Sequence, residues 1–178
     1  MTFHGNHNDF HGSQSIAEVQ VVRNQKKSTQ SPPALEIHLG YWLRLVSNHV
    51  SGNFARALQE RSVSVAEWVA VNQIQRWPDM TPAKLADAMG MTRGAISKVL
   101  DKLQEKKWIS RATSEEDNRV QFLSLTSQGK RALPDLATIA DENDDHFFSA
   151  LDADEQATLR SLLSKLADVH RISNVPVA

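Results

Sequence analysis

Hydrophobic periodicity is the feature of this sequence that most constrains its fold. Apolar residues recur at helical spacing from Ala34 to about Gln59, again between Ser64 and Pro78, and through the last third of the chain. The spacing changes in only one region, where 109–112 and 120–125 are short extended segments joined by a polar stretch. With only 7 glycines and 6 prolines to interrupt helices, the pattern predicts a mainly α fold with one small β-hairpin.

Capping signals divide the middle of the chain into short helices. The pair Ser64 and Glu67 is a capping box that begins one helix. Thr81–Pro82 combines an N-cap with a proline at the first helical position, and Gly90 suits the left-handed residue that ends that helix. Thr92 then caps a helix that we expect to run to about Lys107, directly before the hairpin. This order predicts a winged helix-turn-helix over residues 61–126.

Two further helices are expected after the hairpin, one from Thr126 to about Ala150 and one opened by a second capping box at Asp152 and Glu155. The first and the last helices carry more apolar residues than one small lobe can cover. We therefore expect segments 32–60 and 127–172 to form a helical dimerisation region.

Residues 1–31 are polar and without period, and we expect them to be a disordered arm. The histidines at its start, His4, His7 and His11, could suggest a metal, but a polar tail without folded acidic partners explains them as well. His146 lies in an acidic stretch and could also suggest a metal site, but a solvated acidic helix end is the simpler interpretation. We predict no metal and no cofactor.

Composition and charge exclude several classes of protein. The chain has no cysteine, which excludes disulfides, thiolate zinc sites and cysteine nucleophiles. No nucleophile elbow, phosphate loop or metalloprotease spacing is present, so we predict no enzymatic activity. No apolar run is long enough to span a bilayer or to resemble a signal peptide, which predicts a cytoplasmic protein without a membrane partner.

The net charge of −1 conceals an uneven distribution. Residues 92–131 hold nine Lys and Arg against five acids, and residues 132–170 hold two against nine. A basic middle suits contact with phosphates, although ordinary solvated charge would give the same count. In the helix after Thr92, polar or small residues lie off the apolar stripe and are the types that meet base edges, phosphates or a close groove wall. Those residues are Arg93, Gly94, Ser97, Lys98 and Lys102.

Asp117 and Arg119 lie near the hairpin tip. Residues two apart on an extended strand point the same way, so the carboxylate can orient the guanidinium for insertion into a minor groove. The alternative is a surface ion pair of little energetic weight.

Taken together, these motifs resemble the MarR family of transcription regulators over about Leu35 to Arg171. The segments that carry the resemblance are Leu85-Ala86, Met91 to Leu103, Ile109-Ser110-Arg111, Asp117-Asn118-Arg119 and Leu125 to Gly129. The resemblance implies a homodimer built from the first and the last two helices. It also implies a recognition helix from Thr92 in the major groove of double-stranded DNA, with Arg119 in the adjacent minor groove and Arg111 among the DNA-binding residues.

The sequence departs from the family at Lys107, where a glycine is usual. A lysine in a left-handed helix exit costs on the order of 1 kcal/mol, unless the helix ends differently here. The resemblance further implies repression that a small aromatic or anionic effector relieves. Residues suited to such a ligand are His38, Trp42, Arg44 and Trp68, although both tryptophans could simply be core. A winged-helix protein-interaction module is the alternative function, and weak salt dependence of binding would favour it.

Overall fold

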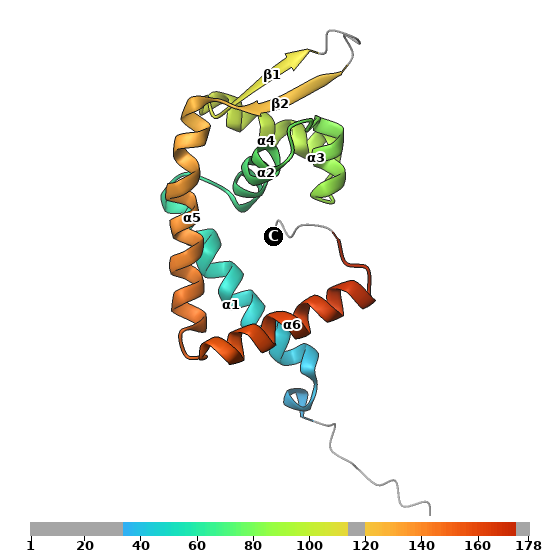
Figure 1. The fold of residues 1–178 in the computed structure, drawn as a ribbon, viewed down its shortest axis with the longest axis vertical. Helices are drawn as coiled ribbons and strands as arrows, with labels where there is room; N and C mark the ends of the chain where they lie inside the picture. The colour runs from blue at the N-terminus through green and yellow to red at the C-terminus, as the bar shows by residue number, and fades with distance from the viewer. Residues whose placement is uncertain (1–33, 114–119, 174–178) are drawn as a thin grey trace, which may run out of the picture. The chain divides into compact units, whose positions relative to one another are not determined.

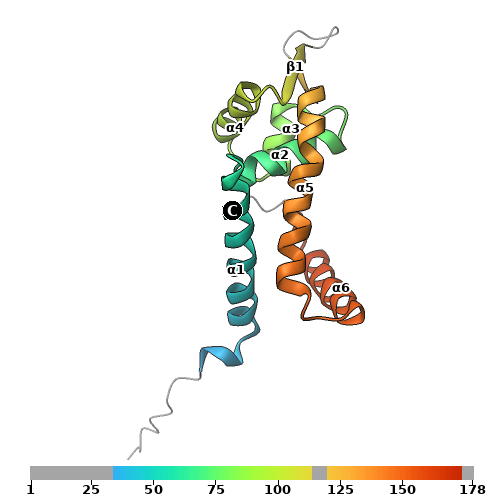
Figure 2. The same cartoon turned by 90° about the vertical axis from the view of Figure 1, so that its left-hand side faces the viewer.

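The computed structural model describes residues 34–113 and 120–173, and the helices and hairpin belong to one unit that begins at Glu36 (Figures 1 and 2). A 3-10 turn over Leu35–Ile37 precedes the first α-helix. The elements that follow are α1 (Leu39–Glu60), α2 (Val65–Arg76), α3 (Pro82–Ala88), α4 (Arg93–Glu105), β1 (Ile109–Thr113), β2 (Gln121–Leu125), α5 (Ser127–Phe148) and α6 (Ala153–Val169). The predicted fold class is confirmed.

The predicted caps are formed. Ser64 Oγ accepts from the Glu67 amide, and the Glu67 carboxylate accepts from the Ser64 amide at 2.8 Å. Thr81, Thr92 and Asp152 each accept a hydrogen bond from the backbone three residues on. Each cap satisfies an amide that the first helical turn would otherwise leave unpaired.

The expected start of the first helix at Ala34 is wrong. His38 is extended, with φ −92° and ψ 124°, and has no side-chain capping bond. The indole of Trp42 donates to the Glu36 carbonyl at 2.8 Å, which stabilises the 3-10 turn in place of a continuous helix. The α-helix therefore begins at Leu39.

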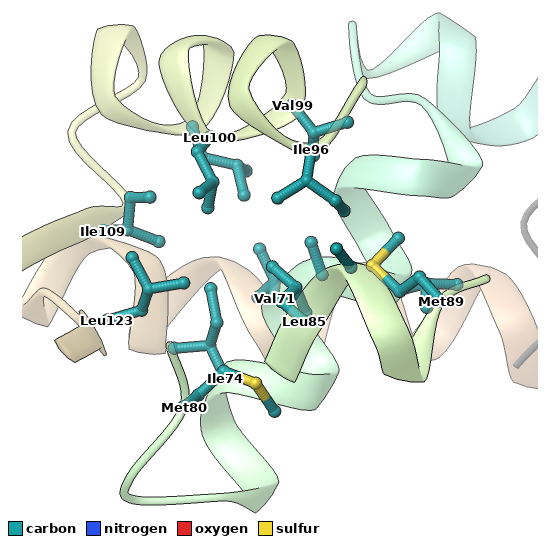
Figure 3. Close-up of a cluster of buried hydrophobic side chains, with 14 of the residues drawn as sticks. Val71, Ile74, Met80, Leu85, Met89, Ile96, Val99, Leu100, Ile109 and Leu123 are labelled. Carbon is teal, nitrogen blue, oxygen red and sulfur yellow. The ribbon is translucent and has the colours of Figure 1, made fainter. Parts of the chain in front are cut away.

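Helices α2, α3 and α4 and the hairpin share one apolar core, and we call this part of the chain the lobe. Val71 and Leu85 face Ile96 and Leu100 across the core, and Leu123 of β2 lies beside them (Figure 3). A second cluster joins the end of α1 to α5 through Leu58, Val63, Leu136 and Ile139. The side chains of Trp68 and Trp108 pack against both clusters.

The hairpin is antiparallel, with Ile109 opposite Leu125 and Thr113 opposite Gln121. The Leu123 amide donates to the Met80 carbonyl at 2.8 Å, which fastens β2 to the segment before α3.

Gly90 (φ 60°) makes the predicted left-handed exit from α3, and Lys107 (φ 58°) makes one after α4. The lysine therefore adopts the conformation that glycine tolerates best. Its strain is offset by hydrogen bonds on both sides. The Trp108 amide donates to the Leu103 carbonyl at 2.9 Å, and the Thr126 hydroxyl donates to the Lys107 carbonyl at 2.6 Å.

Helix α6 contributes nothing to either core. It is described along its whole length and contains no buried residue, and it projects from the end of α5 that is far from the lobe (Figures 1 and 2). Within residues 34–113 and 120–173, no helix is both long enough and apolar enough to cross a membrane.

Candidate nucleic-acid interface

Helix α4 has two distinct faces. Ile96, Val99, Leu100 and Leu103 are buried in the lobe core. The five residues predicted from the sequence to meet DNA are all exposed on the rest of its surface, namely Arg93, Gly94, Ser97, Lys98 and Lys102. Figure 2 shows α4 on the side of the lobe away from α5. Helix α4 thus presents a basic face that the described part of the chain leaves exposed.

The start of α4 suits a phosphate group. Thr92 is exposed, and its hydroxyl accepts from the Ala95 amide at 3.2 Å. The other amides of the first turn have no helical partner and carry the positive end of the helix dipole. Apart from its two chain neighbours and the backbone of its own helix, no atom of the described chain lies within 4 Å of the place where a Cβ on Gly94 would be. A groove wall can therefore approach the backbone there.

Arg111 of β1 lies half-buried at the base of the wing, and its guanidinium donates to Asp101 of α4 at 3.0 Å. The contact engages Asp101, an exposed acid of α4 that lies between Lys98 and Lys102 in the sequence. Sequence reasoning assigned Arg111 to DNA but did not find this partner, because the two residues belong to different elements. Asp117 and Arg119 lie outside the described residues, so their pairing and groove insertion stay predictions.

The end of α4 is held by a cluster of polar contacts that the sequence did not reveal. Lys106 Nζ lies 2.5 Å from Glu67 Oε1 and 2.6 Å from the Ser62 carbonyl oxygen. Glu67 is only 3% exposed. Burial alone would raise the pKa of its carboxyl, but hydrogen bonds from Lys106 and Ser64 outweigh burial and lower the pKa below 4.5. Glu67 is recognisable from sequence only as half of a capping box.

A second joint links the wing to α5. The Thr126 amide donates to the Trp108 carbonyl at 2.9 Å, and the Thr126 hydroxyl, which donates to the Lys107 carbonyl, accepts from the Gly129 amide. A Cβ on Gly129 would overlap the Trp108 carbonyl group. The first turn of α5 can approach the wing this closely only because residue 129 is glycine.

The four residues predicted to meet an effector are not brought together within one protomer. His38, Trp42 and Arg44 are exposed at the start of α1. Trp68 is half-buried and packs edge-to-face with Phe54, with the two ring centres 6.2 Å apart. Phe54 follows Trp42 by twelve residues on the same helix, which is about 18 Å along the helix axis. The effector site stays a prediction.

A large apolar surface of α1 and α6 is uncovered in the protomer. Leu39, Trp42, Leu43 and Val46 of α1 are between 47% and 87% exposed, and Leu159, Leu162, Leu163, Leu166 and Val169 of α6 are between 37% and 69% exposed. Among the described residues, no group of three or more His, Asp or Glu could hold a metal ion. The histidines at positions 4, 7 and 11 lie outside the described residues.

Two short helices joined at a left-handed glycine, a hairpin wing and a free basic face on the second helix define a winged helix-turn-helix protein. The model of the MarR family matches residues 63–120. An uncharacterized HTH-type transcriptional regulator of Bacillus cereus is 30% identical over 134 residues, which cover 70% of this chain and 85% of the relative. The chain belongs to the MarR family and is a transcriptional regulator of that family.

Solved structures show the same fold. A mutant MarR from E. coli complexed with operator DNA is 25% identical, with a TM-score of 0.63 over 74% of this chain and 95% of that chain. CouR from Rhodococcus jostii bound to p-coumaroyl-CoA is 19% identical, with a TM-score of 0.67 over 81% and 99%. BpsR of Bordetella bronchiseptica, whose DNA binding is regulated by 6-hydroxynicotinic acid, is 18% identical, with a TM-score of 0.66 over 77% and 98%.

Proposed function

We propose that this protein is a homodimeric repressor in the cytoplasm that binds a pseudo-palindromic operator and is released by a small aromatic or anionic ligand. The observation that supports DNA binding most directly is the division of α4 into a buried apolar stripe and a free basic face. A helix that its own lobe holds by one side can lie in a major groove with the other side.

The proposed contacts follow from position on α4 and the wing. Arg93 and Ser97, near the start of α4, face base edges, and Lys98 and Lys102 face phosphates. Thr92 and Gly94 give phosphate and backbone contact at the helix start. Arg119, oriented by Asp117, enters the minor groove. Arg111 acts at the base of the wing, where its ion pair with Asp101 holds β1 against α4.

The homodimer is supported by the uncovered apolar surface of α1 and α6. Burying half of that surface would contribute on the order of 10 kcal/mol before the cost of association. We assign segments 32–60 and 127–172 to the dimerisation region and 61–126 to the DNA-binding lobe. Two-fold symmetry then places two recognition helices about 34 Å apart, which requires an inverted repeat.

The effector proposal has support from the two related structures. The names of CouR and BpsR give p-coumaroyl-CoA and 6-hydroxynicotinic acid as their ligands, and both are aromatic and anionic. In this chain Trp68 of α2 packs against Phe54, which lies about 18 Å along α1 from Trp42, too far for one small molecule to touch both tryptophans in a single protomer. A site that uses His38, Trp42 and Arg44 together with Trp68 therefore draws on both protomers.

Selection of bound fragments from random DNA, followed by fluorescence anisotropy, tests the proposal. The selected inverted repeat should bind as one dimer, at least a hundredfold more tightly than scrambled DNA. Lys98→Ala should lower the slope of log affinity against log salt by about 2, because each of two protomers loses one phosphate contact. Lys165→Ala on α6 is the matched control and should leave the slope unchanged. No sequence preference together with a shallow salt slope would refute DNA recognition and favour the protein-interaction module.

A further inference from the structure

The end of the recognition helix is fastened to the corner between α1 and α2 by one side chain. Lys106, the residue after α4, donates from Nζ to Glu67 of α2 and to the backbone carbonyl of Ser62 in the corner. The same ammonium lies 5.3 Å from the centre of the Trp108 ring. Glu67 Oε2 in turn accepts from the amide and the hydroxyl of Ser64, both at 2.8 Å. One lysine thus joins three elements.

This network is more buried than an ordinary surface ion pair, so it contributes more to holding the structure. Glu67 is 3% exposed and Lys106 26%. Ion pairs out of water are weakly screened, and removal of one partner leaves a charge without compensation. Every oxygen of the Glu67 carboxylate has a donor. A network that is satisfied in this way holds one geometry.

The corner that Lys106 contacts is packed against α5. Ser62 has a left-handed backbone with φ 58°. Leu58, four residues before it, and Val63, directly after it, are buried in one cluster with Leu136 and Ile139 of α5. Glu67 belongs to the lobe and holds the ammonium in place, and the hydrogen bond of Lys106 to the Ser62 carbonyl then fastens the lobe to the corner that follows α1. Helices α1 and α5, which pack at this corner, lead toward the apolar surface proposed to form the dimer.

We propose that Lys106 and Glu67 are positioning residues that fix the tilt of the lobe on α1 and so set the half-site spacing that the dimer accepts. The proposal rests on the proposed function. Helix α4 has 13 residues and is about 20 Å long. A tilt of about 10° at its C-terminal joint would move its N-terminal end by about 3 Å, which is close to the axial rise of about 3.4 Å between base pairs. A tilt of that size in both lobes would therefore alter the distance between the two recognition helices by about one to two base-pair steps.

Two neutral variants test the joint. Lys106→Met keeps an unbranched apolar side chain of similar length, and Glu67→Gln can still accept hydrogen bonds from Ser64. The double variant removes both charges, so it leaves no buried charge unpaired and should fold as the native chain does. Operators with the half-sites at the selected spacing, one base pair closer and one base pair farther are then titrated. The native protein should discriminate between spacings at least tenfold, and the double variant less than threefold.

Lys102→Met is the matched control for a lost phosphate contact, since Lys102 is exposed on α4 one turn before Lys106. It should lower the salt slope and keep the spacing preference, whereas the double variant should keep the salt slope and lose the preference. Native discrimination in the folded double variant would overturn the proposal. A lower salt slope for Lys106→Met would also overturn it, because Lys106 would then be a phosphate contact.

A distance measurement separates this proposal from the proposed function. The chain has no cysteine, so spin labels can be placed by Asn48→Cys on α1 and Gln104→Cys on α4, both exposed. Labelled chain diluted with unlabelled chain reports the distance within one protomer and uses no DNA. The distribution should be narrow in the native background and at least twice as broad in the double variant. Absence of operator binding would refute the proposed function alone, and an unchanged distribution would refute the positioning role.

Discussion

Truncation of the apolar face of α6 tests the dimer on which the proposed mechanism depends. Leu162 and Leu166 lie one turn apart on that helix and are 56% and 50% exposed in the protomer. The double variant Leu162→Ala/Leu166→Ala leaves the protomer core unchanged, because α6 has no buried residue in the described chain. We expect it to weaken dimerisation strongly and to change protomer secondary structure little.

The magnitude follows from the exposed fractions. Leu→Ala removes apolar groups worth about 2.4 kcal/mol when fully buried, at about 0.8 kcal/mol per carbon group. About half of each side chain is still exposed in the protomer, so dimerisation can bury a part worth about 1.2 kcal/mol. Two residues on two protomers give about 5 kcal/mol, which raises the dimer dissociation constant by roughly three to four orders of magnitude.

Sedimentation equilibrium over a wide concentration range measures that constant. Ser161→Ala/Lys165→Ala, an exposed pair with the same spacing on a different side of α6, is the control and should dimerise like the native chain. A dissociation constant for the leucine variant within tenfold of the native value would show that α6 does not form the interface.

Three further predictions concern stability. Gly129→Ala should lower the free energy of unfolding by about 1–3 kcal/mol in urea titrations, because its Cβ would overlap the Trp108 carbonyl. Gly94→Ala, where the Cβ meets open space, should instead raise the free energy of unfolding by up to about 1 kcal/mol. Equal effects of the two substitutions would contradict the packing argument. Lys107→Gly should raise the urea midpoint of unfolding, because glycine adopts the left-handed φ of 58° without strain, and the free energy of unfolding should rise by about 1 kcal/mol. The pKa of the Glu67 carboxyl is lowered in the folded state, so its contribution is present above pH 4.5 and is lost as the pH falls through the folded pKa. Glu67→Gln should therefore flatten the acid limb of stability against pH, and an identical limb in both proteins would show that Glu67 makes no such contribution.

Most of the secondary structure was predictable because its causes are local. The caps at Ser64, Thr81, Thr92 and Asp152 act within three residues, and the structure forms all four. The spacing of apolar residues alone predicts which side of α4 is buried, and it also predicts that the basic residues on the other side are exposed. The start of the first helix could not be predicted, because it depends on the reach of the Trp42 indole back to the Glu36 carbonyl.

The sequence by itself determined the order of helices and hairpin, the residues that α4 buries and those it leaves free. Periodicity and capping are properties of short segments, so they can be read without knowing the fold. Only the tertiary structure decided which distant groups meet: Lys106 with Glu67, Arg111 with Asp101, and Gly129 with Trp108. Those contacts join residues 10 to 39 positions apart in sequence, and their partners depend on how the packed cores orient the helices, which no local pattern encodes.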